Sequence, residues 1–172
     1  MSLYGSANRV AAIDTSLART VSVDPVTHGR AIVDANLYMV LGTADEHGRP
    51  WVSPVYYAHV DYREFVWVSR SETLHSRNLL ARPEVSIVIF DSSVPIGTGQ
   101  GVYMAATAEE VTGDARVAAM AVFSRRSLGH GGGAVALDDV EAPAKLRLYR
   151  ATAAAHYILG SIDRLVRADL ER

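Results

Sequence analysis

The sequence predicts a mainly β protein, and three observations support this class. Between Tyr38 and Asp91 the chain alternates apolar runs of strand length with short polar turns. These runs are rich in aromatic and β-branched residues, which favour strands over helices. The composition, with 49% apolar and 21% charged residues over 172 positions, is that of a globular domain with a sizeable core. We therefore expect a sheet-based core with helices at its periphery.

Four strands are predicted in this central region. A turn at residues 45–48, DEHG, separates the first two, because Gly supplies a positive φ and Asp favours turns. The third and fourth are nearly continuous apolar runs, which suits strands that are covered on both faces. The predicted strands are Tyr38–Ala44, Trp51–His59, Glu64–Ser69 and Val85–Phe90.

Helical signals lie outside these strands. Asp24 and Pro25 supply an N-cap and a first-turn proline, and Ser71 supplies an N-cap for a helix that Pro83 would end. A later segment carries Ala, Val and Phe at helical spacing and ends in two arginines, which complement the helix dipole. The predicted helices cover residues 24–35, 72–82 and 114–127.

The second half of the chain adds two strands and two loops. Gly101–Val111 is predicted as a strand, and so is Lys145–Leu159, although the alanines at 153–155 leave a helix open there. The loops cover residues 91–100 and 128–143, and the second contains the sequence GHGGG. A loop of that length in a small domain is often a lid or a flexible connection.

The organisation expected from these elements is a single domain over residues 24–172. An extended arm over residues 1–23 precedes it, and residues 160–172 form a charged, partly frayed end.

Composition and motifs disfavour several classes of function. The formal net charge of −2 argues against a nucleic-acid binder, and the lack of Cys excludes thiol catalysis and Cys-ligated metals. The six His residues show no metal-ligand spacing, so no metal is expected. Residues 97–101, GTGQG, lack the Lys-Ser/Thr of a P-loop, and neither GxSxG nor a strand-following GxGxxG occurs. Without a long apolar run or a signal-peptide pattern, we expect a cytoplasmic protein with no membrane partner.

The junction at residues 69–76 is the first candidate site. A strand that ends at a helix N-terminus leaves backbone N–H groups and a partial positive charge facing any group bound there. This suits a phosphate, and an ordinary capped helix with a solvated basic face is the alternative. The nearby hydroxyls belong to Ser69, Ser71, Thr73 and Ser76, and the nearby cationic or titratable groups to Arg70, His75 and Arg77.

The ordered segments WVSPVYY, FVWVS, LHSRNL and RPEVSIVIFD resemble the FMN-binding split-barrel superfamily of pyridoxamine 5′-phosphate oxidase-like proteins. The resemblance covers residues 31–112 well and residues 146–159 more loosely. It implies a six-stranded antiparallel split β-barrel with peripheral helices, the first of which plugs one end of the barrel. It favours a strand for the last segment, and it implies a homodimer in which two subunits share each flavin.

The resemblance also implies a set of FMN contacts. Ser69, His75 and Ser76 would contact the phosphate, with Arg70 beside them, although many relatives have Lys at the position of His75. Val68 and Trp67 would line the ribityl chain, and the second subunit would contribute from the region of Gln100 or from the C-terminal strand. From the residues alone, core packing is the preferred interpretation of Trp51 and Trp67. The segment expected along the isoalloxazine, through backbone contacts, is Trp51, Val52, Ser53, Pro54 and Val55.

The activity implied is an FMN-dependent oxidoreductase that passes a hydride between flavin N5 and a small organic substrate. Two alternatives stay open, namely a deazaflavin in the same groove and a non-catalytic protein that binds or sequesters flavin. The C-terminal part lacks the Trp-rich segment and Arg-x-His pair of true pyridoxamine 5′-phosphate oxidases, so that activity is not expected. Candidates for an acid or base, none of them assigned, are Tyr56, Tyr57, Tyr103 and His130, the last of which could also lie in a plain flexible loop.

Overall fold

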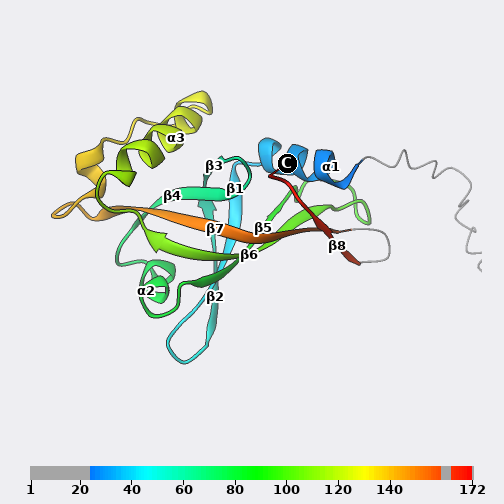
Figure 1. The fold of residues 1–172 in the computed structure, drawn as a ribbon, viewed down its shortest axis with the longest axis horizontal. Coiled ribbons are helices and arrows are strands. Elements are labelled where there is room, and N and C mark those ends of the chain that lie inside the picture. Colours follow the sequence, from blue (N-terminus) through cyan, green and yellow to red (C-terminus); the bar gives the residue numbers. More distant parts are fainter. Residues whose placement is uncertain (1–23, 160–163, 172) are drawn as a thin grey trace, which may run out of the picture.

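The computed structural model describes residues 24–159 and 164–171. Its centre is one antiparallel sheet with the strand order β2-β1-β5-β6-β7-β4-β3, and β8 pairs with β7 (Figure 1). The sheet curves so that β2 also contacts β4. The elements are α1 Pro25–Ala35, β1 Tyr38–Ala44, β2 Pro50–Tyr56, β3 Ala58–Val60, β4 Glu64–Arg70, α2 Leu74–Ala81, β5 Glu84–Phe90, β6 Gly101–Glu110, α3 Ala115–Gly129, the 3₁₀ helix η2 Leu137–Val140, β7 Leu146–Leu159 and β8 Leu165–Ala168.

The mainly β antiparallel class predicted from the sequence is confirmed, and most elements match within one or two residues. Asp24 caps α1 as expected, because its Oδ2 accepts a hydrogen bond from the Thr27 N–H at 3.0 Å. The segment Lys145–Leu159, for which the sequence also allowed a helix, forms the strand β7. The predicted helix over 72–82 is shorter, because Thr73 rather than Ser71 is the N-cap of α2. The long loop after α3 contains η2.

The prediction of one strand over Trp51–His59 is wrong, because the chain changes partners at Tyr57. β2 pairs with β1, whereas β3 pairs with β4. Between them the fully buried Tyr57 donates its backbone N–H to Leu37 O at 3.3 Å and its hydroxyl to Val33 O at 2.7 Å. These bonds hold Tyr57 out of both ladders, which is one reason why the described part of the sheet has eight strands rather than six.

The frayed C-terminal end expected over residues 160–172 is also partly wrong. β8 extends the sheet beside the C-terminal end of β7, with Val166 opposite Ile158. Beyond it Leu170 is fully buried, and its carbonyl accepts a hydrogen bond from Arg30 Nε at 2.9 Å. The arm over residues 1–23, residues 160–163 and residue 172 lie outside the described residues.

Two apolar clusters form the core. The larger one fills the concave side of the sheet and includes Met39, Phe65 and Ile87, all fully buried. α1 covers it, and the helix can approach closely because it has Gly29, where a Cβ would lie only 2.7 Å from Ile158 Cδ1. The smaller cluster lies under α3 and includes Phe123. The two helices therefore cover separate parts of the sheet (Figure 1).

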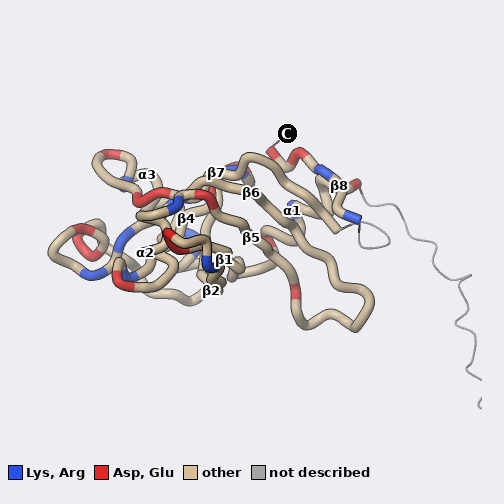
Figure 2. The backbone as a smooth tube through the Cα atoms, turned by 90° about the horizontal axis from the view of Figure 1, so that it is seen from below, with Lys and Arg blue, Asp and Glu red and all other residues tan. Residues whose placement is uncertain are grey.

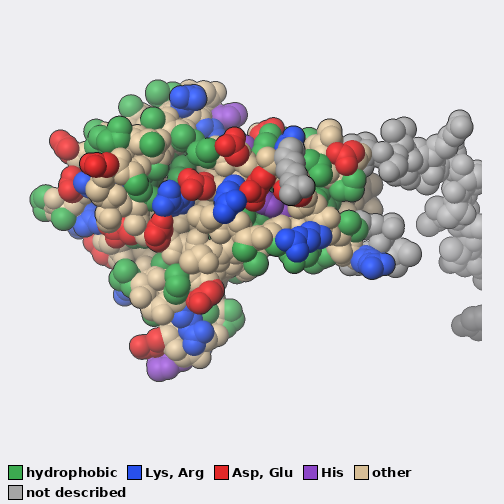
Figure 3. All heavy atoms as spheres, in the orientation of Figure 1, with side chains coloured by type: hydrophobic (Ala, Val, Ile, Leu, Met, Phe, Trp, Pro, Cys, Tyr) green, Lys and Arg blue, Asp and Glu red, His purple; other side chains and the backbone are tan. Residues whose placement is uncertain are grey.

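Charged side chains are mixed in sign over the surface. Figure 2 shows Lys and Arg interspersed with Asp and Glu along the chain, and Figure 3 shows both signs side by side across the sheet. Arg150 of β7, for example, forms two ion pairs: its Nη2 lies 2.6 Å from Glu109 Oε1, and its Nη1 lies 3.5 Å from Glu64 Oε1. Among the described residues, no helix is long and apolar enough to cross a membrane.

Candidate functional site

The candidate site lies where the end of β4, the start of α2 and the middle of β2 meet. Its centre is His75, which is only 7% exposed although it stands in the first turn of a surface helix. Its Nδ1 lies 3.1 Å from Ser53 Oγ on β2. Its Nε2 lies 3.0 Å from Ser69 Oγ at the end of β4. One imidazole therefore joins three elements, and it brings together Ser53, Ser69 and His75 from the predicted set.

Hydrogen-bond chemistry favours one tautomer of this imidazole. Trp51 Nε1 lies 3.1 Å from Ser53 Oγ, and an indole N–H can only donate. Ser53 accepts that bond and can then give its own proton to His75 Nδ1. In that arrangement His75 carries its proton on Nε2, where Ser69 Oγ and Thr73 Oγ1 both lie within 3.0 Å and can accept it. All the groups in this chain are satisfied by a neutral imidazole.

Burial also favours the neutral form of the His75 imidazole. Desolvation lowers the pKa of His75 below its usual range near 6.5. Among the described residues no carboxylate forms an ion pair with His75. The imidazole is therefore neutral at physiological pH when no ligand is bound, rather than the imidazolium that a phosphate contact would suggest.

Thr73 is a second centre of hydrogen bonding. Its Oγ1 lies 3.0 Å from His75 Nε2, 2.8 Å from Ser76 Oγ and 2.9 Å from the Arg70 carbonyl. Its side chain makes no capping bond to the backbone of α2 within the described chain. The first-turn N–H groups of this helix, which have no partner inside a helix, stay available to an external acceptor. Hydroxyls, an imidazole N–H and backbone N–H groups therefore converge on one place.

α2, the helix that carries His75, is fixed to the sheet through its buried face. Asn78 donates from Nδ2 to Thr43 Oγ1 of β1 at 3.0 Å, and both side chains are buried. Leu79 also joins the core. α2 is consequently held against β1 and β2 by its buried face, so the donors of its first turn have a defined position.

The outer edge of β2 borders this cluster. β2 is the last strand at its end of the described sheet, so the N–H and C=O groups along its outer edge have no partner strand. Trp51 and Val52 are 48% and 63% exposed, although successive residues of a strand point to opposite faces. Pro54 is exposed as well. This segment presents an apolar surface and free backbone groups beside the hydroxyls.

The structure places the other predicted residues differently. Trp67 is fully buried and stacks on Tyr149 with ring centroids 5.6 Å apart, and Val55 is also part of the core. Val68 packs on the smaller apolar cluster, and Arg70 is exposed beside the site. Gln100 precedes β6 at the opposite end of the sheet from Ser69, because β6 begins beside Ile158 whereas Ser69 is opposite Arg147.

The acid or base candidates do not join the cluster either. Tyr57 is a buried structural residue, and Tyr56 packs edge-on against Tyr38 and Phe123, with its hydroxyl lacking a partner among the described residues. Tyr103 lies opposite Tyr157 in the β6–β7 ladder, and His130 is exposed just after α3. Within the two described ranges, no three His, Asp or Glu side chains are grouped so that they could hold a metal ion.

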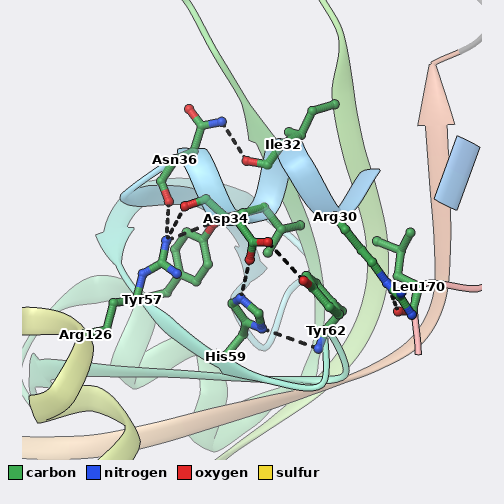
Figure 4. A network of polar contacts seen from close by, with 10 residues as sticks. Arg30, Ile32, Asp34, Asn36, Tyr57, His59, Tyr62, Arg126 and Leu170 are labelled. Atoms are coloured by element: carbon green, nitrogen blue, oxygen red, sulfur yellow. Dashed lines mark hydrogen bonds and ion pairs between the residues drawn. The ribbon is translucent and has the colours of Figure 1, made fainter. Parts of the chain in front are cut away.

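A second polar network was missed by the sequence reasoning (Figure 4). Asp34, at the end of α1, accepts from Tyr62 OH at 3.0 Å and lies 3.1 Å from His59 Nε2. Arg126 of α3 donates from Nη2 to the carbonyls of Val33, Asp34 and Asn36 at 2.7–3.4 Å. These partners are far apart in the chain, so no local pattern indicates them.

Comparison with known proteins gives a family and a set of similar folds. The family model described as pyridoxamine 5′-phosphate oxidase matches residues 27–159. No curated protein matches the chain.

Solved structures with the same fold have diverse descriptions. A heme-binding protein from Mycobacterium smegmatis is 22% identical, with a TM-score of 0.69 over 88% of this chain and 60% of that one. This chain thus spans only about 60% of that protein's length. The heme storage protein HutZ from Vibrio cholerae is 20% identical, with a TM-score of 0.58 over 72% of this chain and 86% of that one. A Clostridium acetobutylicum protein of the pyridoxinephosphate oxidase family, related to a general stress protein of B. subtilis, is 12% identical, with a TM-score of 0.62 over 87% and 98%.

Proposed function

The chain belongs to the pyridoxamine 5′-phosphate oxidase family, and from this premise we propose that it binds FMN and transfers a hydride between the flavin and a small organic substrate. The observation that carries the proposal is the convergence of Ser53, Ser69, Thr73 and Ser76 around the imidazole of His75, next to the free edge of β2. The family relation supplies the ligand class, and this cluster supplies a place for its phosphate.

The residues present fit such a ligand in their donor chemistry. A phosphate monoester offers three acceptor oxygens, and the cluster offers hydroxyls, the Nε2–H of His75 and the first-turn N–H groups of α2. Arg70 and Arg77 are exposed at its rim and can add positive charge. The site thus favours one phosphate rather than the diphosphate of a dinucleotide.

The edge of β2 is the proposed seat of the isoalloxazine ring. Its unpaired N–H and C=O groups can bond the polar edge of the ring, and Trp51 and Val52 can exclude water from its apolar part. Flavin supplies the hydride chemistry when it is bound, while the protein binds and orients it. Trp67 is fully buried and stacks on Tyr149, so it acts from inside the core rather than by touching the ligand.

A homodimer is part of the same proposal. β2 exposes apolar side chains on both of its faces, together with an open edge, and such features are typical of surfaces that another chain covers. A two-fold related copy would bury this strand and complete two equivalent sites. Gln100, at the far end of the sheet, would reach the site only from the second copy.

A non-catalytic heme-binding role is the second candidate, and structural likeness to two heme proteins favours it. Iron in a protein-bound heme needs an axial ligand, most often His. His59 and His75 use both ring nitrogens in hydrogen bonds, so neither is free to bind iron without rearrangement. A phosphate can replace the Ser69 hydroxyl as acceptor of the His75 Nε2–H, whereas iron needs a ring nitrogen that carries no proton and accepts no hydrogen bond, so FMN is the better match for the His75 cluster. The exposed His47 and His130 are not limited in this way.

The deciding experiment is the absorbance spectrum of the purified protein, with mass spectrometry of the released ligand. We expect a flavin spectrum and a released ligand with the mass of FMN. Titration of the protein should show tighter binding of FMN than of FAD. A Soret band would establish the heme role, and the mass of a deazaflavin would establish that alternative. Reduction by a nicotinamide donor, followed by reoxidation with candidate substrates, separates an enzyme from a protein that only stores flavin.

A further inference from the structure

A small cleft lies on the side of the molecule where α3 crosses β3, away from the His75 cluster. It has a volume of about 180 Å³ and is lined by Ala58, His59, Val122, Arg125 and Arg126. Its floor is apolar, from Ala58 and Val122, and its polar walls carry two guanidinium groups. His59 and Arg126 of this lining also belong to the polar network described above (Figure 4).

Arg126 is fixed in place and only partly used. Its Nη2 donates to three carbonyls at the end of α1, and its guanidinium lies 5.0 Å from the centre of the Tyr57 ring. All three of these bonds use Nη2, and the buried Nε has no hydrogen-bond partner among the described residues. The guanidinium also lies beside the Tyr56 hydroxyl: burial raises the pKa of Tyr56, and the guanidinium acts against this larger effect. A rigid guanidinium with unused donors is pre-organised for an oxyanion.

Arg125 borders the same cleft and forms no hydrogen bond or ion pair within residues 24–159 and 164–171. Both arginines line this one small cleft, and two like charges at one cavity favour an anion inside it. The charge of the cleft is therefore not balanced by its own walls.

The nearest acid does not cancel this positive charge. Both oxygens of Asp34 are used, one by His59 and one by Tyr62. His59 adds no charge, because burial lowers its pKa and leaves the ring neutral near pH 7. Asp61 also acts on His59, but neither it nor Asp34 lines the cleft, so the two guanidinium groups have no carboxylate beside them on its described walls.

We propose that this cleft binds a small oxyanion, a carboxylate or phosphate group on a compact molecule, between the guanidinium groups of Arg125 and Arg126. The anion accepts from Arg126 Nη1 and from Arg125, while its apolar portion contacts Ala58 and Val122. Binding would join α3 to the end of α1 and to β3, three elements that otherwise meet through Arg126 and the smaller apolar cluster. The site is independent of the proposed flavin site, because the two share no residue.

The test is an NMR titration of the whole protein with inorganic phosphate in one arm and acetate in the other, at constant ionic strength set with NaCl. We expect saturable shifts of the amides of Ala58, His59 and Val122, with the tighter of the two anions identifying the ligand class. Arg125→Ala should weaken this binding about tenfold, the loss expected for one charge-assisted hydrogen bond. Arg125 is exposed and has no partner in the described chain, so the variant should fold.

The matched control is Arg167→Ala, which removes an exposed arginine on β8 and should leave the titration unchanged. Shifts confined to residues 69–76 would mean that phosphate binds only at the His75 cluster, and the proposal would be refuted. Equal affinity in the Arg125→Ala variant, or shifts that follow ionic strength without saturation, would refute it as well. A failure of flavin binding has no bearing on these outcomes.

Discussion

His75 offers the sharpest test of the proposed phosphate site. The side chain is nearly buried, and its two nitrogens lie within 3.1 Å of Ser53 and Ser69. Replacement by Ala removes the Nε2–H donor and leaves both hydroxyls without that partner. A hydrogen bond to a charged group contributes roughly 1.5–3 kcal/mol, so His75→Ala should weaken FMN binding about ten- to a hundredfold.

The pH dependence follows from the two protonation states of the ring. Burial lowers the pKa of His75 in the empty site, and a phosphate dianion beside Nε2 would raise it in the complex. The complex would then hold the proton more tightly than the empty protein. FMN affinity should therefore fall as the pH rises through the raised pKa. The titration is best made between about pH 6.5 and 8.5, because below this the phosphate itself takes up a proton, with a pKa of about 6.

Two controls separate a phosphate contact from a structural role. Riboflavin lacks the phosphate, so its affinity should not change in His75→Ala. His75→Lys should keep the affinity and flatten its pH dependence, because Lys stays charged to about pH 10. Equal losses for FMN and riboflavin in fluorescence titrations would mean that His75 only supports the fold, and an unchanged affinity for both would place the phosphate elsewhere.

Four further outcomes can be checked. Burial lowers the pKa of His156, so its stabilising contribution is present above the unfolded value of about 6.5 and is lost as the pH falls. Urea unfolding should show that the free energy of unfolding decreases over this pH range. The decrease should be smaller in His156→Gln and unchanged in His47→Gln. Gly29→Ala should destabilise by no more than about 1 kcal/mol in the same assay, because its Cβ would displace only the movable side-chain ends of Ile158 and Leu170, and Ala is a better helix former than Gly by about 1 kcal/mol. Light scattering should give a dimer mass, and Val52→Glu should shift it to a monomer; a monomeric wild type would remove the shared-site model. The protein should not turn over pyridoxamine 5′-phosphate, and steady turnover in a peroxide assay would contradict the inference from its C-terminal part.

The fold was largely predictable because its signals are local. Strands such as Tyr38–Ala44 are marked by their own apolar pattern, and α1 by its Asp-Pro start. The change of partner at Tyr57 was not predictable, because it depends on bonds to Leu37 and Val33, about twenty residues away. β8 was missed for a similar reason, since a charged segment becomes a strand only beside β7.

The candidate site was predictable only in outline. Adjacent polar residues indicated the Ser69–Ser76 junction, and the structure does group Ser69, His75 and Ser76. The contact of His75 with Ser53 crosses from a helix to another strand, so the neutral, internally bonded state of the imidazole could not be inferred. From the residues alone core packing is preferred for Trp67, and only the family resemblance favours a ligand contact; the structure buries this side chain completely.

The position of β7 has a consequence for synthesis of the protein. β7 pairs with β4, β6 and β8, so one late segment joins the two halves of the sheet. Until residues 146–159 leave the ribosome, β4 has only the short β3 as a partner, and one side of β6 is open. Nascent chains would expose these edges to one another, which favours association between copies before folding is complete. A chain that stops before Leu146 should therefore aggregate rather than form a smaller native domain.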